Sequence, residues 1–272
     1  MRYATTSFNI SLQKAMVMRK LWLLSLLIAP LWASAAVTNE FTLANGLKVV
    51  VREDHRSPVV VTQAWYKVGS AYESTGSTGI SHALEHMMFK GTSKVPAGEF
   101  SRLVAYFGGE DNAFTTDDYT AYYQLYSNNR LPLAIELEAD RMANLQLKEE
   151  DFKQEIRVVM EERRQRTDDS PQGIALERFQ AVAMLTTPNR NPTIGWMSDL
   201  ENMSVDELKK WYQTWYAPNN ATLVIVGDVN TDEVKALAEK YFAPIPSQIL
   251  PKTYNPKELT AIGEREVKLE LP

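Results

Sequence analysis

The chain of 272 residues contains no cysteine and only three histidines. Without cysteine it can form no disulfide, no thiolate metal site and no cysteine nucleophile. Long basic runs are absent after residue 35, and the formal net charge is −5. Phosphate binding needs a clustered positive surface, so we expect no nucleic-acid partner.

The N-terminal region has an apolar run of 12 residues, from Leu21 to Trp32. This run is too short to span a bilayer, which takes about 20 residues. Arg19 and Lys20 precede it and a small-residue Ala-Ser-Ala stretch follows, an order typical of a secretory signal peptide. We therefore predict a signal peptide with an upstream extension over residues 1–35, and export to the periplasm. An uncleaved anchor or a buried helix, and an extracellular location, are the alternatives.

The whole chain is 44% hydrophobic and 23% charged, a balance typical of a globular protein. An Asn-Gly pair at residues 45–46 predicts a β-hairpin, and β-branched runs predict further strands. Strands are expected over residues 41–43, 47–52, 59–68, 113–126 and 221–226. Helices are expected over residues 78–88, 98–107, 131–145, 148–165, 204–215 and 231–241. This mixture predicts an α+β fold, in which helices cover one face of a mainly antiparallel sheet.

A proline-rich stretch begins at Pro244 and is typical of a linker. Beyond it, residues 264–271 alternate charged and apolar side chains, which predicts an edge strand. We expect a zinc-binding peptidase domain over residues 36–243. Residues 244–272 would then be a linker and the start of a missing second domain.

His82, Glu85 and His86 form the pattern His-x-x-Glu-His on a predicted helix. Residues four apart share one helix face, so both imidazoles can reach one metal ion, and Glu85 projects close by. The order is the inverted form of the His-Glu-x-x-His zinc motif. The alternative is a histidine packed on an apolar helix face without a metal. His55 stands in a polar turn and is interpreted as ordinary surface.

The chemistry of such a motif is hydrolytic. Zinc binds neutral imidazole and keeps one position open for water in catalytic sites. The metal lowers the pKa of that water from near 16 to roughly 7. A carboxylate such as Glu85 can then relay the proton to the departing amine.

A zinc site needs a third protein ligand, and the segment around residue 160 offers glutamates. Glu155 and Glu162 stand two helical turns apart and share a face, with Val158 and Val159 on the side expected to point inward. Acidic groups on such a face are costly unless they meet a cation. The alternative is a solvated, charge-rich helix, which Glu161 fits.

These residues resemble the pitrilysin/insulinase family of zinc metallopeptidases, close to the bacterial relatives of mitochondrial processing peptidase, in its N-terminal catalytic half. That family joins His-x-x-Glu-His to a glutamate about 76 residues downstream, which is the spacing from His86 to Glu162. It also has a supporting glutamate seven residues earlier, where Glu155 stands. A Gly-Gly-x-x-Asn-Ala-x-Thr stretch at 108–115 and the stretch Trp-Tyr-Ala-Pro-Asn-Asn at 215–220 extend the resemblance over most of the chain.

The resemblance implies a role for each matching residue. By it, His82, His86 and Glu162 bind one Zn²⁺, Glu85 is the general base, Glu155 supports the ligands, and Asn112 and Ala113 bind substrate. In relatives the Asn-Ala strand is an exposed edge that pairs with the substrate backbone, as an extended peptide can. For Asn112 the alternative is a turn residue before a strand.

The resemblance further implies a secreted zinc endopeptidase acting on extended peptides or unfolded polypeptides. Relatives close their active chamber with a second, similar half that supplies an arginine–tyrosine pair, and nothing in this chain matches it. We therefore expect a homologous second half, in the same chain or in a partner subunit. Two alternatives stay open, a non-catalytic structural subunit of a two-component peptidase and a non-peptidase zinc hydrolase.

Overall fold

The computed structural model describes residues 38–252 and 256–270. The signal peptide predicted for residues 1–35 lies outside them. Within the described part of the chain, no helix has the length and apolar character needed to cross a membrane.

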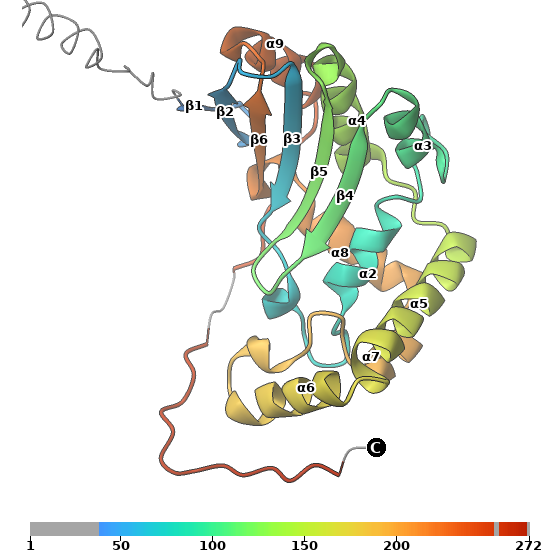
Figure 1. Ribbon diagram of the computed structural model, residues 1–272, viewed down its shortest axis with the longest axis vertical. Helices are drawn as coiled ribbons and strands as arrows, with labels where there is room; N and C mark the ends of the chain where they lie inside the picture. Colours follow the sequence, from blue (N-terminus) through green and yellow to red (C-terminus); the bar gives the residue numbers. More distant parts are fainter. Residues whose placement is uncertain (1–37, 253–255, 271–272) are drawn as a thin grey trace, which may run out of the picture. The chain divides into compact units, whose positions relative to one another are not determined.

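Six strands form one sheet in the order β1-β2-β6-β3-β5-β4 (Figure 1). They are β1 (Thr38–Thr42), β2 (Lys48–Glu53), β3 (Val59–Tyr66), β4 (Glu110–Thr115), β5 (Thr120–Ser127) and β6 (Ala221–Gly227). Every neighbouring pair is antiparallel except β2 and β6, which are parallel. The predicted α+β class with a mainly antiparallel sheet is confirmed.

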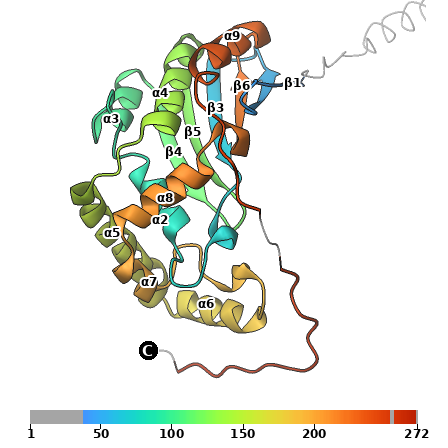
Figure 2. The same ribbon diagram turned by 180° about the vertical axis from the view of Figure 1, so that it is seen from behind.

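The α-helices of the described residues are α2 (Ile80–Met87), α3 (Glu99–Tyr106), α4 (Leu131–Asn144), α5 (Glu149–Arg163), α6 (Pro171–Ala183), α7 (Met197–Asn202), α8 (Val205–Trp215) and α9 (Thr231–Tyr241). Helices α4, α8 and α9 lie on one face of the sheet, which Figure 2 shows from the helix side. In β3, the fully buried Val60, Ala64 and Tyr66 belong to the core between the layers, while the alternate residues are half-buried or exposed. Strand alternation therefore decides which side of the sheet holds the core.

The segment predicted as extended over residues 113–126 is in fact two strands. The chain reverses at Asp117 and Asp118, where the Thr116 N–H donates to the Tyr119 carbonyl oxygen at 2.8 Å. The reversal pairs β4 with β5, and among the described residues the other side of β4 has no strand partner. β4 is therefore an edge strand beside α2, with which it is in contact.

Helices α6 and α7 were not predicted from the sequence. Helix α6 has a single buried residue, Glu177, and several exposed apolar ones, so it lacks the periodic pattern of a core-facing helix. A π-helical segment, Arg164–Asp168, separates it from α5. Figures 1 and 2 place α5, α6 and α7 beyond the end of the sheet near α2.

The C-terminal region is extended. Residues 256–270 form neither helix nor strand, so the edge strand predicted over residues 264–271 is absent from the described part of that stretch. The Glu258 carboxylate accepts hydrogen bonds from the backbone N–H groups of residues 185–187. Arg265 donates to the carbonyl oxygens of Val182 and Ala183, so the stretch contacts the C-terminal end of α6 and the residues that follow it.

Candidate metal centre

Helix α2 carries the predicted zinc motif. Its apolar residues Ile80, Leu84 and Met87 are buried in the core. His82 is also buried, and His86 is half-buried on the side toward α5. One face of α2 therefore packs into the core, and another face carries the two histidines.

The structure brings His82, His86 and Glu162 together. The Nε2 atoms of His86 and His82 lie 3.3 Å and 3.8 Å from Oε2 of Glu162. Ligands about 2.1 Å from a tetrahedral zinc ion stand roughly 3.4 Å apart, so these separations suit such an ion. Two imidazoles and one carboxylate also form a donor set that zinc uses in catalytic sites. Across the described residues, this is the only group of three or more such side chains whose ligand atoms converge.

Glu155 supports the centre from behind His86. The Nδ1 atom of His86 lies 2.9 Å from Oε1 of Glu155, which leaves Nε2 directed toward Glu162. The ammonium of Lys90 pairs with the other oxygen of Glu155. Sequence reasoning did not select Lys90, because a lysine after a helix end carries no signal of its own. A carboxylate that holds a ligating imidazole in this way fixes the orientation of the ring.

The pKa values of the two histidines are shifted in opposite directions. Burial lowers the pKa of His82 to about 3, with help from the nearby His86 and Arg166. Burial also acts to lower the pKa of His86, but the hydrogen bond to Glu155 and the charges of Glu155 and Glu162 raise it above the ordinary value. His82 is therefore held in the neutral form that a metal requires, whereas a metal at His86 would compete with a proton.

Glu85 stands beside the metal-binding residues. The hydroxyl of Thr115, the last residue of β4, donates to its Oε2 atom at 2.5 Å. Burial raises the pKa of Glu85, against the Thr115 hydrogen bond and the charge of His86, which lower it. Thr115 was not among the predicted site residues, although it is the threonine of the Asn-Ala-x-Thr stretch.

Asn112 and Ala113 lie on the edge strand, away from the turn that was the alternative for Asn112. The Ala113 N–H donates to the side-chain oxygen of Asn112 at 2.8 Å. On α5, Val159 and Glu155 are buried, but Val158 is half-exposed and does not share their face. The prediction that Val158 points inward was therefore wrong. At about 100° per residue, Val158 lies about 300° and Val159 about 400° around the helix from Glu155, so the two valines lie on opposite sides of Glu155.

Arg166 lies in the π-helical segment one turn after Glu162. Its guanidinium pairs with Oε1 of Glu162 at 2.6 Å, whereas both histidines approach Oε2. The two oxygens of Glu162 thus have different partners. π-Helical turns are frequent at functional sites, and this one places a cation beside the candidate metal ligand.

The loop at residues 193–196 contacts both metal-binding helices, α2 and α5. Gly79, with φ +84°, precedes α2 and lies against Gly195 so closely that a Cβ on either would stand 2.5 Å from a backbone oxygen. From α5, Arg163 donates to the Gly195 carbonyl oxygen at 2.9 Å and to Glu177 at 2.7 Å. The loop therefore holds the start of α2 and the end of α5 together.

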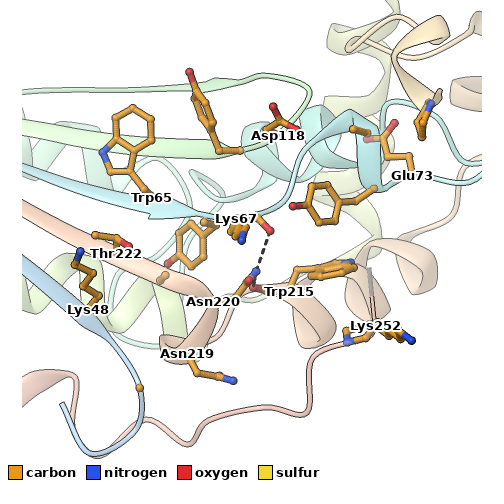
Figure 3. Close-up of a pocket in the computed structure, with 18 of the residues that line it drawn as sticks. Lys48, Trp65, Lys67, Glu73, Asp118, Trp215, Asn219, Asn220, Thr222 and Lys252 are labelled. Carbon is orange, nitrogen blue, oxygen red and sulfur yellow. Dashed lines mark hydrogen bonds between the residues drawn. The ribbon is translucent and has the colours of Figure 1, made fainter. Parts of the chain in front are cut away.

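A cavity of about 1060 Å³ lies on another part of the molecule and is lined by Trp65, Tyr72, Glu73 and Trp215 among others (Figure 3). None of the predicted site residues lines it. The buried Glu73 accepts hydrogen bonds from the N–H groups of Gly79 and Ser81, at 2.7 Å and 2.8 Å. Burial raises the pKa of Glu73 to about 7, against these two hydrogen bonds. One wall of the cavity is therefore bonded to the start of the metal-binding helix.

The family of the chain follows from comparison with known sequences. Residues 48–195 match the family described as insulinase (peptidase family M16), and residues 202–272 match the peptidase M16 inactive domain. The chain belongs to the insulinase family of peptidases.

Individual relatives agree with this placement. The chain is 41% identical over 233 residues to the zinc protease PqqE of Helicobacter pylori, covering 83% of this chain and 52% of that protein. It is 27% identical over 214 residues to a probable mitochondrial-processing peptidase subunit beta of Arabidopsis thaliana, covering 79% and 40%. The chain thus spans about half the length of the relatives it matches.

Solved structures show the same fold. A protease from Helicobacter pylori superposes with a TM-score of 0.79 at 39% identity, covering 83% of this chain and 55% of that one. The first half of the periplasmic protease PqqL from Escherichia coli has a TM-score of 0.74 at 24% identity, covering 81% and 50%. The second likeness is one of fold alone. The expected resemblance to the N-terminal half of such peptidases is confirmed.

Proposed function

We propose that this chain is the zinc-binding half of an exported endopeptidase that cleaves extended peptides or unfolded polypeptides. The observation that carries the proposal is the convergence of His82, His86 and Glu162 beside Glu85 at the edge of the sheet. Relatives described as zinc proteases support the choice of metal. The N-terminal signal pattern, together with a structural neighbour described as periplasmic, supports export.

His82, His86 and Glu162 would hold one zinc ion per chain, with Glu155 fixing the ring of His86. When bound, zinc would supply Lewis-acid activation of water and of the peptide carbonyl group. The structure describes no fourth side chain at the cluster. Three protein ligands and an open position are the arrangement of catalytic zinc sites, whereas structural sites use four protein ligands.

Glu85 would act as the general base. In this role a carboxylate oxygen takes a proton from the attacking water and returns it to the departing nitrogen. The half-buried position of Glu85 supports the role, because burial raises the pKa of a carboxyl group toward the working pH.

Substrate would lie along β4, with Asn112 and Ala113 in contact with its backbone. The free edge of β4 supports this placement, since an extended peptide adds to such an edge by main-chain hydrogen bonds. The Asn112 side chain would leave the Ala113 N–H as the peptide binds, because both compete for the same donor. An extended peptide is the form of substrate that such an edge selects.

We further propose that a homologous second half, in the same chain or in a partner subunit, completes the active chamber. The proposal is supported by the relatives' greater length and by the neighbour described as the first half of PqqL. A non-catalytic structural subunit is the alternative function, but His82, His86 and Glu162 converge and Glu85 is present next to His86, which favours an enzyme.

Zinc content and peptide cleavage test the proposal. About one zinc per wild-type chain is expected, with loss of zinc in His82→Ala and retention in His55→Ala, the matched control outside the cluster. Glu85→Gln should keep zinc and lose cleavage of a quenched fluorescent peptide. Absence of zinc from the wild type would refute the metal assignment, and full activity in zinc-loaded Glu85→Gln would refute the role of Glu85.

A further inference from the structure

Thr115 makes the one side-chain hydrogen bond that Glu85 receives within the described ranges. The bond runs from the Thr115 hydroxyl to Oε2 of Glu85 at 2.5 Å. The neighbouring Thr120 hydroxyl lies 3.5 Å from Thr115 and donates to the Val68 carbonyl oxygen at 3.0 Å. The Thr115 hydroxyl has one proton to donate, and its contact with Glu85 at 2.5 Å is much shorter than that with the Thr120 oxygen at 3.5 Å, so the proton belongs to the Glu85 bond. In the part of the chain described, Oε1 of Glu85 has no protein donor.

The backbone of Thr115 belongs to the free edge of β4. The Thr116 N–H to Tyr119 hydrogen bond makes these two residues a bonded pair of the antiparallel ladder. Bonded and non-bonded pairs alternate along such a ladder, so the pairs of Thr115 and Ala113 are non-bonded ones. Their N–H and C=O groups therefore point away from β5 and toward the side where a peptide could add.

Side-chain alternation places the Thr115 hydroxyl on the inner face of β4. Residues at positions 111, 113 and 115 are half-buried, whereas Asn112 and Phe114 are exposed. The inner face is the side on which α2 contacts β4 and on which Glu85 receives its hydrogen bond. One residue thus contributes its backbone to the free edge and its hydroxyl to the carboxylate of the candidate base.

We propose that Thr115 is a positioning residue that orients Glu85 for proton transfer while its backbone takes part in peptide binding. The inference rests on the proposed function. With Oε2 held by the hydroxyl, the other carboxylate oxygen is the one available to take a proton. A peptide paired with the backbone of Thr115 would lie at a fixed distance from that oxygen, because one residue sets both contacts.

The test uses Thr115→Val, which keeps the shape and removes the hydroxyl, and Thr115→Ser, which keeps the hydroxyl. Thr222→Val is the matched control, since Thr222 is a half-buried strand residue without a side-chain hydrogen bond in the described structure. Zinc content, kcat and KM are measured on the form in which the wild type turns over, the chain itself or the chain with its complementing half. Circular dichroism reports folding.

Thr115→Val should lower kcat by about tenfold to hundredfold, the range for losing a hydrogen bond to a charged group, with KM and zinc content unchanged. Thr115→Ser should recover most of kcat, and Thr222→Val should match the wild type. An unchanged kcat in folded Thr115→Val, or a rise in KM alone, would overturn the positioning role. So would a serine variant no better than valine. If Thr115→Val fails to fold, the serine variant is the test. A folded, zinc-loaded Thr115→Ser that loses kcat would overturn the positioning role, because this variant keeps the hydroxyl. A wild type without zinc and turnover would instead refute the proposed function.

Discussion

Replacement of Glu162 by glutamine should weaken zinc binding strongly, whereas replacement of the adjacent Glu161 should not. The side chain of Glu162 is 19% exposed, and its Oε2 atom is shared by both candidate metal-binding histidines. The side chain of Glu161 is 55% exposed and pairs with Arg164 at 3.1 Å on the surface. The two substitutions are chemically identical and one residue apart, so they separate the role of a ligand from the loss of a negative charge.

The expected magnitude follows from the number of ligands. Zinc sites with four protein ligands bind with about 10–16 kcal/mol, or about 3 kcal/mol for each ligand if shared equally. Loss of the Glu162 ligand should therefore raise the Kd for zinc by about 100-fold. Arg166 acts in the same direction, because its guanidinium would lose its partner and face the metal as a like charge. For Glu161→Gln the change should stay within about twofold, since exposed ion pairs contribute little.

The assay is a competition titration against a chromophoric zinc chelator at one pH and one salt concentration. Salt is fixed because the surface pair of Glu161 is screened by it, while the partly buried site is screened less. Equal effects of the two substitutions, or a larger effect for Glu161→Gln, would refute the assignment of Glu162 as the ligand.

Three further predictions follow from contacts around the fold. Glu155→Gln should weaken zinc binding by about 10- to 100-fold, as measured in the same titration, because the carboxylate that orients His86 is lost; an unchanged Kd would contradict this. His55 should titrate above its usual pKa, because it pairs with Asp228 at 2.6 Å, so the associated stability is present at acid pH and is lost as pH rises through the raised pKa. NMR titration should show the pKa of His55 returning toward 6.5 in Asp228→Asn, and no return would exclude this cause. Gly195→Ala should lower the thermal midpoint of unfolding, since its φ is +88° and the added carbon would meet backbone at 2.5 Å; an unchanged midpoint would show that the loop can move aside.

The metal-binding residues were predictable because each group lies within one helix. His82 and His86 share a helical face by spacing alone, and so do Glu155 and Glu162. The spacing could not show that α2 and α5 pack side by side. That part came from the family resemblance, and the converging ligand atoms now support it.

Residues that act from other elements were not predictable in the same way. Thr115 reaches Glu85 because β4 packs against α2, a contact that the sequence alone does not encode. No glycine marks the chain reversal that ends β4, and its residues all keep negative φ angles. Lys90 and Glu73 meet their partners through contacts that no local pattern encodes. Helix α6 was overlooked because it buries a single side chain, so amphipathic periodicity gave no signal.

The contact between Gly79 and Gly195 has a consequence for how this centre can tolerate change. The start of α2 lies there directly against the main chain of the 193–196 loop, and α5 reaches the same loop through the Arg163 guanidinium. Substitutions elsewhere in the apolar core can alter how firmly the domain is folded, yet they do not change this contact between α2 and the loop through a larger or smaller side chain. Divergent sequences could therefore keep the same metal-site geometry while their cores are rebuilt, provided that both positions keep glycine and position 163 keeps its arginine.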